Sequence, residues 1–280
     1  MGSTVLGIDI GGSTTKIVAF RGSEPTCELQ VKASDQVTSA YGAIGRLAEQ
    51  NGIALGDVSE IVITGVGASF FGGDIYGIPT RKVQEFEAIG RGGLYLSGLG
   101  EAYVASLGTG TAIVRASRGG IRHIGGTGIG GGTLLGLASA ILGKRDIESL
   151  VAAAEGGVLE NVDLTVGEIT KLEIPLLPPT ATAANFGNIK STASDADMAA
   201  GLFNMVYQAI GMLAVFAARG DSIKDVVLTG SLTATPYARR ILFPVADNYG
   251  LRFLIPEKAV FATAIGAALG GARTEMQLAP

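Results

Sequence analysis

The first third of the chain alternates short apolar runs with glycine and hydroxyl residues, and one segment within it has helical spacing. Apolar residues three or four positions apart, as at Val37, Ala40, Ile44 and Leu47, predict an amphipathic helix, whereas short apolar runs bounded by turn residues predict strands. This region is therefore expected to form a strand-rich α/β unit. Its predicted elements are strands near 4–10, 15–20 and 26–32, a helix over 37–51 and a strand over 60–64.

The rest of the chain repeats the opening pattern and then becomes more helical. Strands over 103–107 and 111–115 flank LGTGT much as the first two strands flank DIGGST, which is a weak internal repeat. The stretch 202–219 is apolar nearly all round, which predicts a buried helix, and Asn204 and Gln208 interrupt it. The other predicted elements are a loop GGIRHIGGTGIGGG, a helix over 133–142, an acidic amphipathic stretch over 146–170, a proline-rich loop over 175–180, a long helix near 195–219, a strand over 224–229, a helix over 236–248, a strand over 251–255 and a final helix over 259–272.

Charge and composition exclude several classes of protein. The chain has 280 residues, 47% hydrophobic and 16% charged, which suits one large core or two joined ones. A net charge of −4 and the isolated pair Arg239-Arg240 offer no basic surface for a nucleic acid. No uninterrupted apolar run reaches the ~18–20 residues that span a bilayer, and the amino-terminus lacks the pattern of a leader peptide. We therefore expect a cytoplasmic protein with no nucleic-acid or membrane partner.

Cysteine and glycine contents narrow the chemistry further. Cys27 is the single cysteine, so one chain can form neither an internal disulfide nor a multi-cysteine metal or iron–sulfur site. Glycine accounts for 43 of 280 residues, about 15% against a usual ~7%. The glycines gather between apolar runs, which indicates ligand-binding loops.

The first glycine turn has the residues that a metal-bound polyphosphate needs. Its strand delivers Asp9 to the carboxyl end, where the carboxylate could hold Mg²⁺ through water, because Mg²⁺ keeps much of its hydration shell. Turn amides and hydroxyls donate hydrogen bonds to phosphate oxygens, and a lysine adds positive charge. A G-G-S-T turn alone is also typical of an ordinary hairpin. The candidate ligands after the acid are Gly11, Gly12, Ser13, Thr14 and Lys16.

Three further glycine segments are candidates for binding the same ligand. LGTGT repeats the first turn without the acid, and the glycine triplet before the helix 133–142 would form an anion site at a helix N-terminus. The triplet fits neither the Walker pattern nor the dinucleotide fingerprint. The turn in LTGSLTATP lies late in the chain, where an adenine or ribose could lie. The candidates are Thr109, Gly110 and Thr111, then Gly130, Gly131 and Gly132, and finally Gly230 and Ser231.

The order and separation of five motifs resemble the type II pantothenate kinases of the actin-like ATPase superfamily. These motifs are GIDIGGSTTK, SLGTGT, IGGTGIGGGTLLGL, TAANFG and TGS, and the likeness covers almost the whole chain. The two phosphate turns are shared across the superfamily, whereas TAANFG, the GGxGxGGG loop and EFEA at 85–88 are more specific. The resemblance implies an α/β fold of two ribonuclease-H-like (actin-like) domains facing a nucleotide cleft. The domains would span 1–98 and 99–280, with the last helix (259–272) packing back toward the first.

The resemblance also implies a homodimer that uses Mg-ATP to phosphorylate the hydroxyl of pantothenate, the first step of coenzyme A synthesis. Asp9 would organise Mg²⁺, Lys16 and the GGST turn would face the β- and γ-phosphates, and LGTGT would form the second phosphate turn. Glu85, in EFEA, would be the general base, which suits phosphoryl transfer because positioning and charge neutralisation supply most of the catalysis. Glu87 would point some 100° away on a helix. Without the resemblance, Glu85 would be taken for an ordinary exposed residue.

His123 departs from the family pattern at a position that bears on the substrate. Just before the GGxGxGGG loop, that family has an arginine that meets the pantothenate carboxylate, and His123 stands in its place. Arg122 is a poor substitute, because neighbouring side chains of an extended segment point to opposite faces. A lone histidine is also often structural. The candidate substrate-binding residues are His123, Arg122 and Thr127, and we expect weak pantothenate binding or a related small alcohol or acid as substrate.

Two other functions share parts of this pattern. Activators of 2-hydroxyacyl-CoA dehydratases have a similar GIDIG start and the actin-like fold, but they hold an iron–sulfur cluster through two cysteines from each of two chains. Cys27 alone does not supply that set. The other alternative is a nucleotide-binding regulator that has lost catalysis, with His123 as the mark of the loss. Acceptor-dependent release of ADP would distinguish a kinase from such a regulator.

Overall fold

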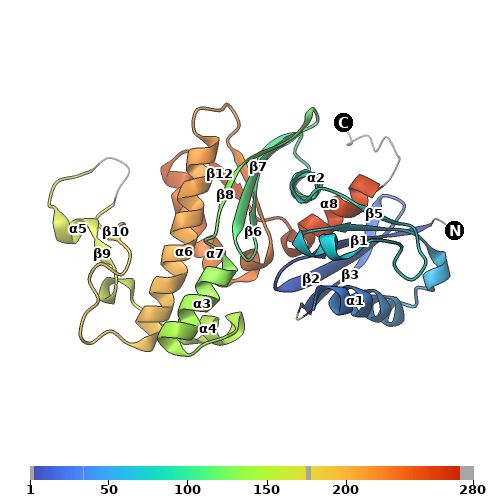
Figure 1. Ribbon diagram of the computed structural model, residues 1–280. Helices are drawn as coiled ribbons and strands as arrows, with labels where there is room; N and C mark the ends of the chain where they lie inside the picture. The colour runs from blue at the N-terminus through green and yellow to red at the C-terminus, as the bar shows by residue number, and fades with distance from the viewer. Residues whose placement is uncertain (1–2, 34, 175–177, 272–280) are drawn as a thin grey trace.

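Two five-stranded sheets lie side by side, and helices cover their faces (Figure 1). The structure is a computed structural model that describes residues 3–33, 35–174 and 178–271. The first sheet has the order β3-β2-β1-β4-β5. Its elements and the helices nearby are β1 (Thr4–Ile10), β2 (Thr14–Arg21), β3 (Glu24–Lys32), α1 (Gln36–Asn51), η1 (Leu55–Asp57), β4 (Val58–Thr64), η2 (Val66–Phe70), β5 (Thr80–Lys82) and α2 (Glu85–Ser97).

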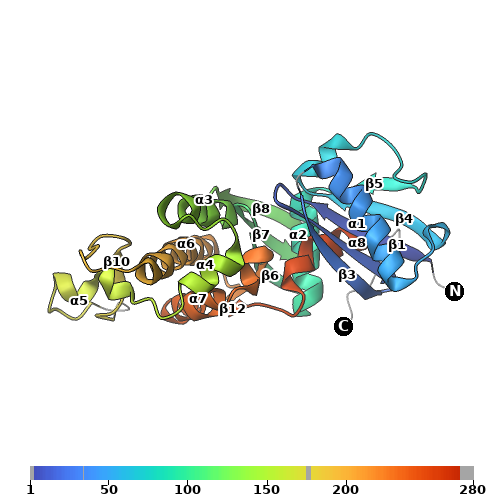
Figure 2. The ribbon, with the colours of Figure 1, turned by 90° about the horizontal axis from the view of Figure 1, so that it is seen from below.

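The second sheet has the order β12-β11-β6-β7-β8, and a small two-stranded sheet of β9 and β10 projects from its far side (Figure 2). The remaining elements are β6 (Glu101–Leu107), β7 (Thr111–Ser117), β8 (Gly120–Thr127), α3 (Gly131–Leu142), α4 (Ile147–Ala153), η3 (Leu159–Asn161), β9 (Leu164–Thr165), α5 (Val166–Ile169), β10 (Thr182–Ala184), α6 (Asp195–Ala218), β11 (Asp225–Thr229), η4 (Ser231–Ala234), α7 (Pro236–Asn248), β12 (Arg252–Leu254), η5 (Ala259–Phe261) and α8 (Ala262–Gly271).

The two large sheets share one topology. In each, three strands pair antiparallel and a fourth strand joins the first in parallel. Each fourth strand ends at a glycine that begins a short 3₁₀ helix: Gly65 has φ 86° and ψ 170°, and Gly230 has φ 90° and ψ 172°. Only glycine adopts this backbone conformation without strain. The internal repeat predicted from the two glycine turns is thus a repeat of whole structural units.

The structure corrects one of the predicted elements. Residues 120–127 form β8 and not a loop, because β7 supplies hydrogen-bonding partners that override the low strand propensity of the glycines. The acidic amphipathic stretch 146–170 folds as the series α4, η3, β9 and α5. The final predicted helix is η5 followed by α8, and residue 272 lies outside the described residues, as does 175–177 of the proline-rich loop.

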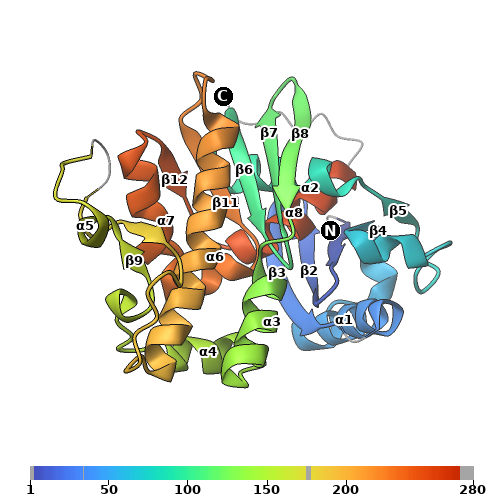
Figure 3. The same cartoon turned by 60° about the vertical axis from the view of Figure 1, so that its left-hand side comes forward.

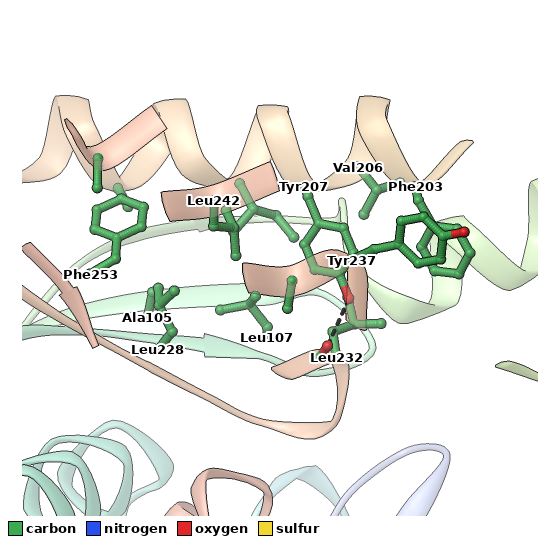
Figure 4. Close-up of a cluster of buried hydrophobic side chains, with 14 of the residues drawn as sticks. Ala105, Leu107, Phe203, Val206, Tyr207, Leu228, Leu232, Tyr237, Leu242 and Phe253 are labelled. Carbon is green, nitrogen blue, oxygen red and sulfur yellow. Dashed lines mark hydrogen bonds between the residues drawn. The ribbon is translucent and has the colours of Figure 1, made fainter. Parts of the chain in front are cut away.

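The helix α6 is the core helix of the second unit. By length and hydropathy it could cross a membrane, yet 67% of its most apolar stretch is buried against the rest of the chain. Figure 4 shows Tyr207 of α6 pointing toward Leu107 of β6 and Leu232, with Phe203 of α6 beside Tyr237 of α7. The Tyr207 hydroxyl donates to the carbonyl of Leu232 at 2.7 Å, so the buried phenol has a polar partner. The predicted buried helix is confirmed.

The motif TAANFG folds around a buried carboxylate. Asp163, which is fully buried, accepts hydrogen bonds from the backbone N–H of Phe186 at 2.8 Å and from Nδ2 of Asn204 at 2.7 Å. Thr182 and Asn185 donate to the same carboxylate. Because a buried charge is costly unless hydrogen bonds satisfy it, this network explains the polar residues of the motif.

The two units meet where α2 crosses α8 (Figure 3). α2 packs on the second sheet, where Ile89 shares a core cluster with Val104 and Val114. α8 packs on the first sheet, where Ala264 shares a cluster with Val18. The division of the chain near residue 98 remains a prediction.

Glycines bring the two helix backbones into contact at the crossing. A methyl group at Gly92 would overlap the Ala262 carbonyl, and one at Gly266 would overlap the Ala88 carbonyl. Small residues at both positions are therefore required for this packing distance.

We expect Gly92→Ala to lower the free energy of unfolding by about 1–3 kcal/mol, because the added methyl overpacks the crossing. Gly42→Ala is the matched control: Gly42 lies inside α1, and a methyl group added there would have no atom within 4 Å, so the helix propensity of alanine should raise stability by about 0.5–1 kcal/mol. Urea unfolding of both variants measures the difference. Equal effects of the two substitutions would contradict the crossing as a tight constraint.

Candidate functional site

Asp9 and Lys16 face one another at the end of the first hairpin. They are direct register partners on β1 and β2, and the Lys16 Nζ lies 3.6 Å from the Asp9 Oδ2. Only 8% of Asp9 and 6% of Lys16 is exposed. Gly11 closes the turn between them by donating its N–H to the Thr14 carbonyl at 3.0 Å. The hairpin thus holds the almost fully buried carboxylate of Asp9 beside the ammonium group of Lys16.

The buried position of Asp9 affects its protonation. Burial raises the pKa of the Asp9 carboxyl, and the charge of Lys16 offsets part of that rise. Gly65, at the end of the neighbouring strand β4, leaves room for the carboxylate: a methyl group there would lie 2.7 Å from Asp9 Oδ1. The carboxylate is therefore held from two sides, by a lysine across the hairpin and by glycine backbone beside it.

Glu85 reaches the same place from α2. The strand β4 pairs with β1 so that Thr64 lies opposite Asp9, and the Thr64 hydroxyl donates to the carbonyl of Val83 at 2.9 Å. This contact starts α2 beside the first turn, with Glu85 as its first residue. Burial raises the pKa of the Glu85 carboxyl, the charge of Asp9 raises it further, and Lys16 acts in the opposite direction.

The first and second glycine turns touch. The hydroxyls of Ser13 and Thr109, which are 96 positions apart in the chain, lie 3.1 Å from one another, and both residues are exposed. Residues 9–16, 64–65, 85 and 107–111 are called the turn junction below. It brings together Asp9, Gly11, Gly12, Ser13, Thr14, Lys16, Glu85, Thr109, Gly110 and Thr111.

The glycine triplet packs against the second turn. The N–H groups of Gly131 and Gly132 donate to the carbonyls of Gly108 and Thr109, at 2.8 and 2.9 Å. A methyl group at Gly130 would lie 2.6 Å from the Thr109 carbonyl oxygen, so no other residue fits there. These amides hold the turn in place through the N-terminus of α3, and they are already hydrogen-bonded to protein carbonyls.

Three of the candidate residues near the second turn are occupied structurally or lie behind it. The Thr111 hydroxyl is buried and donates to the Ile129 carbonyl at 2.9 Å. Gly230 lies behind β6, where a methyl group would be 2.6 Å from the Leu107 carbonyl oxygen, and Ser231 begins η4 directly after it. Thr109 is thus the exposed hydroxyl of the second turn.

The three candidate substrate residues lie on two faces of β8. The ring of His123 stacks on Phe86 of α2, with centroids 3.9 Å apart and planes 9° apart. Arg122 lies on the opposite face, close enough to Tyr103 for its charge to act on the pKa of that phenol. The Thr127 hydroxyl accepts the N–H of Ile129 at 3.1 Å.

Thr127 also lines a groove of about 300 Å³ between β8 and α6. That groove lies on the face of the sheet away from α2. His123 is therefore the one of the three that lies on the α2 side, against Phe86.

The structure adds two residues that the sequence did not single out, and it shows what the neighbouring acid Glu87 does. Gly65 contacts Asp9, and Phe86 contacts His123. The only sequence signal for Phe86 is its place between two acids in EFEA. Glu87, the neighbouring acid, pairs with Arg91 one helical turn away, with Oε1 2.6 Å from Nη2. The second acid of the motif therefore forms an ion pair on the helix surface.

The residues of the turn junction fit a magnesium nucleotide. Among the described residues no three acidic, histidine or cysteine side chains form a metal cluster, and the carboxylates of the turn junction are those of Asp9 and Glu85. Mg²⁺ typically uses one or two carboxylates with phosphate oxygens and water, which matches this set. Gly12 has open space on its side-chain side, and the hydroxyls of Ser13 and Thr109 are exposed beside it.

The chain is similar to proteins of known activity. The model of the Fumble family matches residues 102–243. The type II pantothenate kinase of Staphylococcus haemolyticus is 28% identical over 272 residues, which cover 94% of this chain and 98% of the relative. The type II pantothenate kinase of Staphylococcus aureus is 29% identical over 277 residues, which cover 94% of this chain and 97% of that relative.

Solved structures share the fold. The ADPNP-bound activator of 2-hydroxyisocaproyl-CoA dehydratase from Clostridium difficile has a TM-score of 0.68 at 17% identity, covering 95% of this chain and 93% of its own. A ROK family glucokinase from Streptomyces griseus, in complex with glucose and AMPPNP, has a TM-score of 0.60 at 14% identity, covering 95% and 98%. At such identities the likeness concerns the fold alone, and it confirms the two ribonuclease-H-like (actin-like) α/β domains.

We expect Gly65→Ala to abolish most nucleotide-dependent activity, because its methyl would push against the Asp9 carboxylate and the Ile10 carbonyl. Gly77→Ala is the control, since Gly77 has a similarly positive φ of 72° but open space around it. The measurement is ATP turnover alongside thermal unfolding of both variants. Loss of activity in both, in proportion to their loss of stability, would show that backbone strain and not the Asp9 contact is responsible.

Proposed function

Because this chain belongs to the Fumble family, we propose that it is an ATP-dependent kinase that transfers the γ-phosphoryl group of ATP to the hydroxyl of pantothenate, the first step of coenzyme A synthesis. The curated relatives, which this chain matches over nearly its whole length, carry the name type II pantothenate kinase. Phosphoryl transfer to an alcohol needs a phosphate-binding surface, charge neutralisation and a group that accepts the hydroxyl proton. The turn junction supplies each of these.

One observation carries the proposal: Glu85 of α2 lies close enough to the Asp9–Lys16 pair for their charges to act on its pKa. The first of the two touching turns contains that pair. A carboxylate with a raised pKa is a stronger base than an ordinary one. Such a group beside a phosphate-binding turn has the placement of a general base. Glu85 would accept the proton of the attacking hydroxyl.

The other residues of the junction would bind and orient the nucleotide. Bound Mg²⁺ would neutralise charge on the phosphates, and Asp9 would hold it through water. Ser13 and Thr109 would donate their hydroxyls to phosphate oxygens from opposite sides. Lys16 would hold Asp9 ionised and add positive charge at the β- and γ-phosphates. Mg²⁺ would bind together with the nucleotide, since among the described residues no cluster of three ligating side chains is available to hold it alone.

The acceptor would lie between Glu85 and β8, on the face where His123 and Phe86 stack. Without an arginine at the position of His123, the carboxylate of pantothenate would lack a bidentate guanidinium partner. We therefore propose that pantothenate binds more weakly here than to a site with arginine at this position. We also propose that the enzyme works as a homodimer in the cytoplasm.

Glu85→Gln should lower kcat for phosphorylation of pantothenate by about 10²–10⁴-fold while the affinity for Mg-ATP stays nearly unchanged, because a positioned base contributes that much. Glu87→Gln is the matched control, since that acid pairs with Arg91 and should have little effect. Product formation is measured by mass spectrometry with a panel of hydroxyl acceptors, and nucleotide binding by calorimetry. Nucleotide binding without acceptor-dependent ADP release would instead identify a regulator without catalysis.

The raised pKa of Glu85 predicts the acid limb of the pH profile. As pH falls through that pKa, the base becomes protonated and kcat/KM for the acceptor falls, so the limb should lie above the ordinary glutamate value of about 4.3. Neutral pantothenamide at saturating Mg-ATP is the acceptor of choice, because it does not titrate in this range. A limb at or below the ordinary value would mean that burial does not act on the catalytic base.

A further inference from the structure

We infer that the ring stack of Phe86 and His123 positions the Glu85 carboxylate, and that His123 acts there through its flat ring and not through its charge. The inference rests on the proposed role of Glu85 as general base. Phe86 is the next residue along the helix from Glu85, and its ring lies 3.9 Å from the ring of His123 with the planes 9° apart. Phe86 and His123 are thus positioning residues, one step removed from the reacting atoms.

The first turn of α2 has little local support. Its N-cap residue, Gln84, makes no side-chain hydrogen bond to the helix, unlike Asp35 of α1 and Ser194 of α6, which accept from their own helices. A helix N-terminus without a cap frays readily, because its first N–H groups lack partners. Tertiary contacts must therefore hold the turn that carries Glu85.

The strand β8 supplies that contact through an irregularity. Val114 pairs with His123 and Ile113 pairs with Gly125, so Ile124 has no partner and the strand bulges there. Before the bulge, His123 lies opposite Val114, which packs in the cluster beneath α2. After it, Ile124 and Gly125 line the groove on the α6 side. His123 is the last residue of β8 before the bulge, and a bulge commonly re-aims a side chain beside a functional site.

The contact ties the base to the second domain. The helix α2 begins at Glu85, beside the first sheet, where the Thr64–Val83 hydrogen bond holds the preceding segment. His123, in contrast, belongs to the second sheet. Ring stacking in an offset or parallel arrangement is specific in geometry, so it fixes the direction of the helix start and not only its distance. A small displacement of a catalytic group can reduce the rate about 10²-fold.

The test compares His123→Ala, His123→Phe and Phe86→Leu, with Tyr249→Leu as control. Tyr249 is 40% exposed, Phe86 is 39% exposed, and the control residue lies at the end of α7. We expect His123→Ala and Phe86→Leu each to lower kcat by about 10–100-fold with little change in the KM for Mg-ATP. His123→Phe should retain most of the wild-type kcat, because a phenyl ring can still stack on Phe86. The double variant Phe86→Leu/His123→Ala should be no worse than either single one, since both remove one interaction.

Other outcomes are equally informative. If His123→Phe raises the KM for pantothenate but not for neutral pantothenamide, His123 contacts the carboxylate by charge and the inference is overturned. Additive losses in the double variant would overturn it as well, because the two rings would then act separately. Wild-type protein that transfers phosphate to neither pantothenate nor pantothenamide would instead overturn the proposed function. β8 is an edge strand and His123 is exposed, so far-UV melting should show each variant folded.

Discussion

The backbone contact between α2 and α8 is the constraint on which the rest of the arrangement depends. Gly92 and Gly266 let each helix lie directly on the backbone of the other, and each helix packs on one of the two sheets. A pair of bulkier residues would separate the domains by the width of the added groups. The two glycine turns would then no longer meet, and Glu85 would move away from Asp9. The geometry of the turn junction is therefore set by a packing distance at the helix crossing.

The turn junction combines two kinds of support. The first turn is rigid because a buried ion pair, a tight hydrogen-bonded hairpin and the Gly65 backbone hold Asp9. The second turn is rigid because the amides at the start of α3 hold its carbonyls. Glu85 differs, since it begins a helix without a cap and depends on contacts from both domains. Glu85, the proposed base, is thus the part of the site most sensitive to how the domains are placed.

Local sequence was sufficient for most of the elements and for the chemistry of the turns. Apolar spacing predicted the core strands and the buried helix α6, and the residues DIGGST and LGTGT predicted two similar hairpins. It failed at residues 120–127, where glycine-rich sequence indicated a loop but pairing with β7 makes a strand. Strand formation there depends on a neighbour that propensity does not contain.

By itself the sequence determined the residue types of the site: a carboxylate and a lysine around a glycine turn, a second turn with hydroxyls, and an acid in EFEA. Only the tertiary structure decided which of these meet. It brought Ser13 to Thr109, put Glu85 next to Asp9, turned Arg122 to the far face and stacked His123 on Phe86. The physical reason is that backbone pattern and propensity act over a few residues, whereas these contacts join segments tens of positions apart. Their distances follow from how the two sheets and the crossing helices pack.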